Sequence, residues 1–210
     1  LYSVHKYIDA IDRVAFIGIH TGTLGFLTDY QRDEYLQLVL DIQNEQHRIY
    51  ERHLLEVSCL EGTYFALNEV RIENNRRSQV MDVYINDEYF ETFRGNGLCV
   101  STPVGSTAYN KSLGGAVINT CTGLMQLSEI AGIHHNAYRS LGSSLILDQS
   151  HTIRFQSQSY QGAILGVDHL VIDLKDKDCI CVKMSSKKAR FLQYRNVSFT
   201  QRLKRAYLNS

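Results

Sequence analysis

The feature that most constrains the fold is a series of short segments in which apolar and polar residues alternate. These segments fill most of the chain beyond residue 48, and examples are TYFALNEVRIE, QVMDVYINDEYFETFRG, SSLILD, HTIRFQSQ and GVDHLVIDLKDKDCICVKM. Alternation of this kind predicts strands with one buried face. The pair Asn86-Asp87 and residues 175–178 predict hairpin turns between such strands. We therefore expect residues 48–184 to form a β-rich domain.

The two ends of the chain have a different pattern. HKYIDAIDRV and DEYLQLVLDIQ have apolar residues at helical spacing, and the apolar run VAFIGI at residues 14–19 predicts a strand of a parallel sheet covered on both faces. Near the C-terminus ARFLQYR predicts another strand, and Phe199, Leu203 and Ala206 have helical spacing. We expect an α+β fold, in which an incomplete α/β (Rossmann-like) domain comprises residues 1–47 and 185–210. The chain returns to this α/β layer at its C-terminal end.

Composition limits the partners and the compartment. Lys plus Arg and Asp plus Glu number 22 each in the 210 residues, so the formal charge of zero favours neither a nucleic acid nor a membrane surface as partner. The five cysteines include no C-x-x-C pair, which predicts neither disulfides nor a metal site and suits the reducing cytoplasm. Cys179 and Cys181 share one face of a strand, as small core residues. No apolar run approaches the ~20 residues that span a bilayer.

The stretch STPVGSTAYNKSLGG, residues 101–115, gathers hydroxyls and glycines around the only proline, Pro103. One interpretation is that Ser106 or Thr107 caps a helix that begins near Ala108. The other is that the loop binds a polar ligand, and a helix N-terminus also favours anions. The two interpretations are compatible, and the residues alone leave both open.

Two further motifs have a structural and a functional interpretation. GIHTGTLGF sets Gly18, Gly22 and Gly25 just after the predicted strand, where glycines serve ordinary turns and where ligands approach open α/β sheets. ALNEV places Asn68 and Glu69 within or at the end of a strand. An amide and a carboxylate there suit an adenine edge and a ribose diol, whereas the alternative is a solvated edge strand.

Two polar pairs interrupt apolar strand patterns. Asn96-Gly97 is a strong turn signal ahead of an apolar strand. Asp168 and His169 interrupt the strand pattern of GVDHLVID, and a lone strand histidine is more often a satisfied core group than a catalyst. No Ser/His/Asp order, H-E-x-x-H motif or paired-carboxylate spacing indicates a hydrolase.

Taken together and in order, these motifs resemble the bacterial NAD kinase family over nearly the whole chain. The most specific part is RGNGLCVSTPVGSTAYNKSLGG, residues 94–115, which is similar to the family pattern G-D-G-x-x-x-[ST]-T-P-[TS]-G-[ST]-T-A-Y-x-x-S-x-G-G. The resemblance implies transfer of the γ-phosphate of ATP to the 2′-hydroxyl of the adenosine ribose of NAD, with a divalent metal such as Mg²⁺. It also implies a homodimer or homotetramer.

The resemblance assigns the adenosine end of NAD to two segments of the chain. Asn68 and Glu69 would hold the adenosine, and Thr107, Ala108 and Tyr109 would line the adenine pocket. The hydroxyl-rich loop would then position a dinucleotide.

The resemblance places further residues around the rest of the ligand. Ser112 would lie along the dinucleotide and Phe26 beside it. Ala131 and Tyr138 would contribute to a site that a neighbouring subunit completes, and His169 would lie near the phosphate-transfer region as a possible catalytic residue.

The sequence departs from the family pattern at three places. The family's G-G-D-G-T motif, with its catalytic base, is absent, and Leu1 aligns directly after it, so we expect the base upstream of Leu1. Asn96 replaces an aspartate expected on the nicotinamide side, and Val104 replaces a Ser or Thr. The alternative to an NAD kinase is therefore a noncatalytic NAD-binding module or inactive fragment. A kinase of lipids or sphingoid bases fits the S-T-P-x-G-S-T-A-Y block less well.

Overall fold

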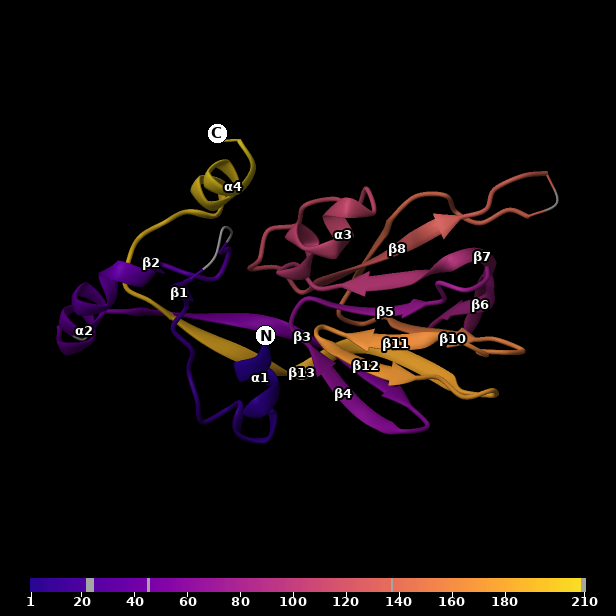
Figure 1. Cartoon of the computed structure of the whole chain (residues 1–210), viewed down its shortest axis with the longest axis horizontal. Coiled ribbons are helices and arrows are strands. Elements are labelled where there is room, and N and C mark those ends of the chain that lie inside the picture. Colours follow the sequence, from indigo (N-terminus) through magenta and orange to yellow (C-terminus); the bar gives the residue numbers. More distant parts are fainter. Residues whose placement is uncertain (22–24, 45, 137, 209–210) are drawn as a thin grey trace. The chain divides into compact units, whose positions relative to one another are not determined.

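The computed structural model describes residues 1–21, 25–44, 46–136 and 138–208, so Gly22 lies outside the described residues. The chain divides into two compact units. The larger unit comprises Leu1–Ile8 and His53–Lys187, and the smaller comprises Asp9–Arg52 and Lys188–Ser210. Strands β3 (Arg48–Cys59) and β13 (Cys179–Gln193) run from one unit into the other (Figure 1).

The predicted β-rich architecture is confirmed. The described strands include an 11-stranded sheet of order β12-β11-β5-β7-β6-β10-β13-β3-β4, in which β8 also pairs with β7 and β9 pairs with β8. The remaining strands of this sheet are β4 (Gly62–Ala66), β5 (Glu69–Glu73), β6 (Gln79–Ile85), β7 (Glu88–Ser101), β8 (Leu124–Gly132), β9 (Leu145–Asp148), β10 (Thr152–Gln156), β11 (Ile164–Val167) and β12 (Leu170–Asp173). The turn at Asn86-Asp87 is also confirmed, because both residues have positive φ, at 50° and 66°, as a two-residue hairpin requires.

Alternation along these strands builds one apolar core within the larger unit. Every second residue of a strand faces the core, so Val70 and Ile72 of β5 are buried together with Leu165 and Val167 of β11. Burial of such side chains stabilises the fold by roughly 1.5–3 kcal/mol for each large aliphatic residue. The opposite face of β5 therefore remains for polar side chains.

The pair Asn96-Gly97 was expected to form a turn, and this prediction is wrong. Both residues lie inside β7, where Gly97 pairs with Glu73 of β5. A Cβ atom on Gly97 would lie 2.0 Å from the carbonyl oxygen of Ile72. The glycine is thus required by close backbone approach rather than by a turn. The Asn96 amide donates to the Asn74 carbonyl at 3.1 Å, and the Asn74 N–H donates back to the Asn96 carbonyl at 2.8 Å.

Cys179 and Cys181 were expected in the core, and this prediction is also wrong. They do share one face of β13, but Cys179 is exposed and Cys181 is half-buried, whereas Ile180 and Val182 are fully buried. Because successive side chains of a strand point to opposite faces, one register must be chosen. The register that buries the larger aliphatic side chains leaves the cysteines outside.

The smaller unit contains β1 (Ile19–His20), β2 (Tyr30–Gln31), α2 (Tyr35–Gln43) and α4 (Phe199–Tyr207). The predicted strand at residues 14–19 is largely absent, because only its last residue, Ile19, lies in a strand, and Phe16 makes an isolated bridge to Phe191. Ala15 and Ile19 are exposed, so this run is not covered on both faces as the prediction required.

The helices near the ends of the chain are predicted with mixed success. In α4, Phe199, Leu203 and Ala206 are half-buried, as their helical spacing predicts, and a capping box fixes its start. HKYIDAIDRV forms a shorter helix than expected, α1 (Tyr2–Lys6), followed by the 3-10 turn Ile8–Ala10. None of the helices in the described part of the chain is long and apolar enough to cross a membrane.

Candidate functional site

The polar face of β5 and the segment that follows β7 form the candidate site. Glu69, Arg71 and Glu73 alternate with the core residues of β5, and β5 pairs with β7 on one side and β11 on the other. After β7 the chain continues through a 3-10 turn, Gly105–Thr107, into the short helix α3 (Tyr109–Ser112). Figure 1 shows α3 beside the end of β7 that approaches β5. The solvated edge-strand interpretation of Glu69 is therefore wrong, since β5 is an interior strand.

The bend at Leu67 and Asn68, between β4 and β5, is held by the carboxylate of Asp168. Asp168 Oδ2 accepts the N–H of Leu67 at 2.8 Å, and Oδ1 accepts those of Asn68 at 2.8 Å and Glu69 at 3.2 Å. Nε2 of His5, in α1, lies 2.8 Å from Oδ2. These contacts connect the β11–β12 hairpin directly to the bend that carries Asn68.

Asp168 and His169 form the turn between β11 and β12 and do not interrupt a strand. Asp168 has a φ of 52°, in the left-handed region that Asp tolerates in tight turns. His169 is exposed, and its ring lies 4.7 Å from the ring of His5 and 5.8 Å from that of Tyr2. The interpretation of His169 as a satisfied core group is therefore wrong.

The hydroxyls of the loop after β7 bond to the protein's own backbone. Thr102 Oγ1 donates to the Leu67 carbonyl at 2.6 Å, Ser106 Oγ donates to the Pro103 carbonyl at 2.7 Å, and Thr107 Oγ1 donates to the Val104 carbonyl at 3.1 Å. The N-cap of α3 is Ala108, which makes no side-chain capping bond, so the interpretation of Ser106 or Thr107 as a helix cap is wrong. The hydroxyls therefore shape the loop through bonds to backbone carbonyls.

Glu69 is a buried carboxylate with an unused acceptor. The residue is 6% exposed, and its Oε2 has no hydrogen-bond partner among the described residues. Burial first, and then the nearby charge of Asp168, raise the pKa of Glu69 to about 7, while Arg71, whose Nη1 lies 3.9 Å from Oε1, opposes the shift. An acceptor of this kind suits the hydroxyl donors of a sugar.

Tyr109 supplies an aromatic surface close to this carboxylate. Its ring centre lies 5.7 Å from the guanidinium carbon of Arg71, and burial, followed by the charge of Glu73, raises the pKa of its phenol. Ala108 is half-buried and Ser112 is exposed. A ring beside a guanidinium and a buried acceptor fits a ligand that carries both a heteroaromatic base and a sugar.

The sequence analysis missed a polar network beneath α3. Asn110 is fully buried, and its Oδ1 accepts from Ser128 Oγ at 2.9 Å while its amide donates to the Ala116 carbonyl at 3.3 Å. Gln126 of β8 bonds both the N–H and the carbonyl of Ala116. The available signal was the polar pair Gln126 and Ser128 inside the apolar pattern LMQLSEIAG.

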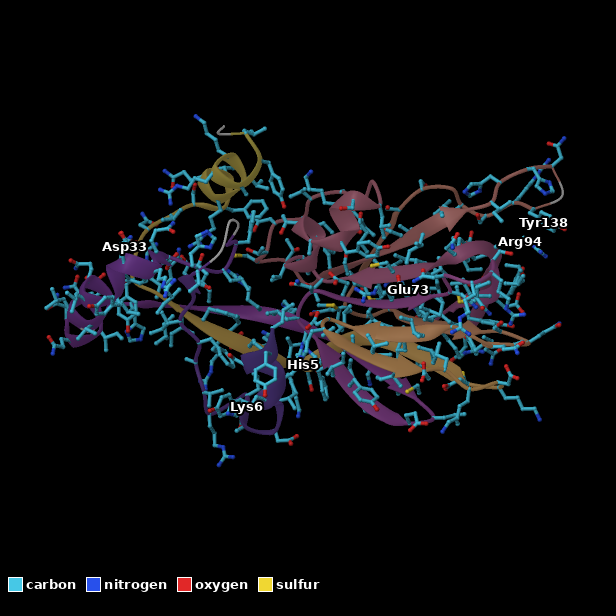
Figure 2. All side chains as sticks on the ribbon, viewed as in Figure 1. His5, Lys6, Asp33, Glu73, Arg94 and Tyr138 are labelled. Carbon is cyan, nitrogen blue, oxygen red and sulfur yellow. The ribbon has the colours of Figure 1, made fainter. Side chains whose placement is uncertain are left out.

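Two of the expected site residues lie elsewhere in the larger unit. Along β7, Gly95 pairs with Gly132 whereas Ser101 pairs with Glu69, so Ala131 lies roughly 20 Å along the strand from the end that carries Glu69. Tyr138 lies at the same end as Ala131, with its ring 4.0 Å from the guanidinium carbon of Arg94. Figure 2 shows this pair well away from Glu73.

The remaining expected residues occupy other environments. Asn96 lies midway along β7, where its amide anchors the Asn74 backbone. Phe26 belongs to the smaller unit, where its ring lies 5.9 Å from that of Phe199 and 6.4 Å from that of Tyr207. Among the described residues, no group of three or more His, Cys, Asp or Glu side chains is arranged to hold a metal ion.

Comparison with known sequences gives matches over nearly the whole chain. Residues 67–194 match the family model of the ATP-NAD kinase C-terminal domain. The chain is 40% identical over 214 residues to NAD kinase 1 of Bacillus subtilis, covering 99% of this chain and 80% of that protein. It is 37% identical over 217 residues to the NAD kinase of Staphylococcus aureus strain JH9, covering all of this chain and 81% of that protein.

Solved structures with the same fold include two kinases of pyridine dinucleotides. Yeast NADH kinase, complexed with NADH, superposes with a TM-score of 0.75 at 23% identity, covering 89% of this chain and 55% of that one. An NAD kinase from Archaeoglobus fulgidus, in complex with ATP, superposes with a TM-score of 0.70 at 21% identity, covering 91% of this chain and 70% of that one. At these identities the likeness shows the fold.

Proposed function

Because this chain belongs to the NAD kinase family, we propose that it transfers the γ-phosphate of ATP to the 2′-hydroxyl of the adenosine ribose of NAD, giving NADP. In this reaction the 2′-oxygen bonds to the γ-phosphorus, the bond from that phosphorus to the β,γ-bridging oxygen breaks, and the hydroxyl proton is released with ADP. The observation that carries the proposal is the buried Glu69 carboxylate, with an unused acceptor, close to Tyr109. Phosphoryl transfer depends mainly on such positioning.

In this proposal, different residues of the larger unit contact different parts of the adenosine end of NAD. We propose that Asn68 and Glu69 accept and orient the adenosine, with Glu69 Oε2 receiving a ribose hydroxyl. Tyr109 then provides a face for the adenine ring, with the backbone of Thr107 and Ala108 at its edge. This assignment uses an acceptor, Glu69 Oε2, that has no hydrogen-bond partner within the part of the chain that the structure describes.

The outer positions are proposed from the family resemblance. Ser112 would lie along the dinucleotide, Phe26 beside it, and Asn96 toward the nicotinamide side. His169, exposed at the β11–β12 turn, would face the phosphate-transfer region.

The proposed assembly is a homodimer or homotetramer, in which Ala131 and Tyr138 complete a neighbour's site. This accounts for their separation from Glu69 within one chain. Light scattering on the purified protein measures the subunit number directly. The five cysteines include no C-x-x-C pair, a pattern that favours the reducing cytoplasm as the compartment.

The described side chains do not provide a three-ligand metal site, so no residue is assigned to Mg²⁺. Mg²⁺ usually binds through substrate phosphates with few protein ligands, and we propose that it enters with ATP. The sequence also contains no G-G-D-G-T motif, so no residue is assigned as the base.

The test measures NADP formation and NAD binding separately. Two proteins are incubated with NAD, ATP and Mg²⁺. One is this chain, and the other is the same chain with a segment that carries the family's G-G-D-G-T motif joined before Leu1. We expect NADP from the second protein, and NAD binding by calorimetry to weaken about tenfold or more in Tyr109→Ala, since aromatic stacking contributes ~1–3 kcal/mol per base. Tyr89→Ala, which removes an exposed tyrosine of the same unit, is the control.

Each outcome has a distinct meaning. If the joined protein neither forms NADP nor binds NAD, the proposed function is refuted. NAD binding without turnover in the joined protein would favour the noncatalytic NAD-binding module, for which Asn96 in place of an aspartate is the motivating observation.

A further inference from the structure

We propose that Asp168 and Thr102 are positioning residues, which fix the bend Leu67–Asn68–Glu69 from its two sides and thereby set the geometry of the NAD-binding pair. The inference rests on the proposed function of Asn68 and Glu69. Neither Asp168 nor Thr102 touches the ligand in this scheme. Their effect is transmitted through the backbone of the bend.

The N–H side of the bend is occupied by one carboxylate. The Asp168 side chain is fully buried, and its two oxygens accept the N–H groups of Leu67, Asn68 and Glu69. The backbone N–H of Asp168 also donates to the Glu69 carbonyl at 3.0 Å. Three successive amides are thus oriented toward a single acceptor group, which leaves the bend little freedom to rotate.

The carbonyl side of the bend is occupied by the loop after β7. The Thr102 hydroxyl donates to the Leu67 carbonyl at 2.6 Å, and the Thr102 N–H donates to the Asn68 carbonyl at 2.9 Å. The same hydroxyl accepts the N–H of Gly105 at 3.0 Å. A Cβ atom on Gly105 would lie 2.0 Å from the Asn68 carbonyl oxygen, so the loop presses directly against the bend.

The hydrogen bonds to the bend require the Asp168 carboxylate and the Thr102 hydroxyl in particular. An amide in place of the Asp168 carboxylate has one acceptor oxygen instead of two, and its NH₂ group would face either the N–H of Leu67 or those of Asn68 and Glu69. A buried donor without an acceptor is costly, so the bend would rotate to find another partner. Both Asp168 and Thr102 lie in the closed interior, with exposures of 6% and 0%, where water cannot substitute for them.

The first experiment compares two carboxylate-to-amide variants by calorimetric titration with NAD. In Asp168→Asn we expect the dissociation constant to rise by about tenfold or more, because a small displacement of binding groups is sufficient for such losses. Asp178→Asn is the matched control. Asp178 is also a buried carboxylate of the larger unit near a hairpin turn, where it accepts the N–H of Leu60 at 2.9 Å, away from the bend. We expect its NAD affinity to equal that of the wild type.

The second experiment uses Thr102 and remains informative if Asp168→Asn does not fold. Thr102→Val keeps the shape of the side chain but removes the hydroxyl, and Thr102→Ser keeps the hydroxyl. We expect weaker NAD binding in the valine variant and recovery in the serine variant, with unfolding midpoints measured for both. Recovery of affinity with the hydroxyl distinguishes positioning from simple filling of space.

The results separate this inference from the proposed function. If the wild type does not bind NAD, the proposed function fails. If the wild type binds NAD but Asp168→Asn binds it equally well, or Thr102→Val binds it as well as Thr102→Ser, the positioning inference is overturned while the function stands.

Discussion

The buried carboxyl group of Glu69 makes the free energy of unfolding depend on pH. Its pKa rises from 4.5 to about 7, first because burial penalises the charge and then because of Asp168. Between these two values the folded protein retains a proton that the unfolded chain has lost. The free energy of unfolding therefore falls as pH rises through this window, by about 3 kcal/mol from this residue, and stays level above it.

The variant Glu69→Gln tests whether ionisation of Glu69 lowers the free energy of unfolding. We expect it to be more stable than the wild type near about pH 8 by up to ~3 kcal/mol, with an advantage that shrinks toward about pH 5, because glutamine mimics the protonated acid. Urea unfolding at the two pH values measures the difference. The same variant should bind NAD more weakly at about pH 8, since it lacks the ionised acceptor. An advantage that does not change with pH would contradict the assignment.

At the scale of elements, β7 shows why a glycine can be essential without a turn. Gly97→Ala should lower the free energy of unfolding by roughly 1–3 kcal/mol or more, because its Cβ atom would meet the Ile72 carbonyl oxygen at 2.0 Å and the backbone has no room to yield. Thermal or urea unfolding measures the loss.

Gly123→Ala is the matched control for Gly97→Ala. The nearest atom to its added Cβ atom would be the end of the Gln149 side chain at 3.0 Å, which can move. Equal effects of the two substitutions would show that backbone approach in β7 is not the cause.

How far the sequence predicts the fold depends on the kind of signal. Alternation predicts the strands and helical spacing predicts α4, because both follow from local geometry. The register of β13 depends on which of its side chains are buried in the core. The path of β7 depends on the close approach of Gly97 to the Ile72 carbonyl oxygen of β5. A local sequence pattern contains neither piece of information.

The candidate site divides in the same way. The sequence singles out Asn68 and Glu69 as residue types that are unusual in a strand, and it singles out Tyr109 only through the family resemblance. The supporting role of Asp168 and the burial of Asn110 depend on partners that lie far away in the chain, so they emerge only from the three-dimensional arrangement.

At the scale of the whole molecule, the two units differ in how much they bury. The large apolar cluster lies entirely within the larger unit. In the smaller unit, α2 buries only Leu38, and no described residue of α4 is classed as buried. Local opening is easiest where few apolar side chains are buried.

Hydrogen exchange measured by mass spectrometry tests this difference. Backbone amides of α2 and α4 should exchange well before those of β5, β7 and β11, because the latter open only with the core. Amides within the core strands of the larger unit serve as the internal reference. Equal protection in both groups would show that the small unit is stabilised by more than its own buried side chains.

The bend at Leu67–Glu69 also has a consequence for biosynthesis. The Asp168 carboxylate that collects its amides lies 99 to 101 positions further along the chain. In a growing polypeptide the backbone of this bend therefore lacks its Asp168 contacts until the β11–β12 hairpin has been synthesised. Ribosome-stalled chains that end before and after that hairpin can be assayed for NAD binding. The comparison would show whether the nascent chain binds NAD only after the hairpin has been synthesised.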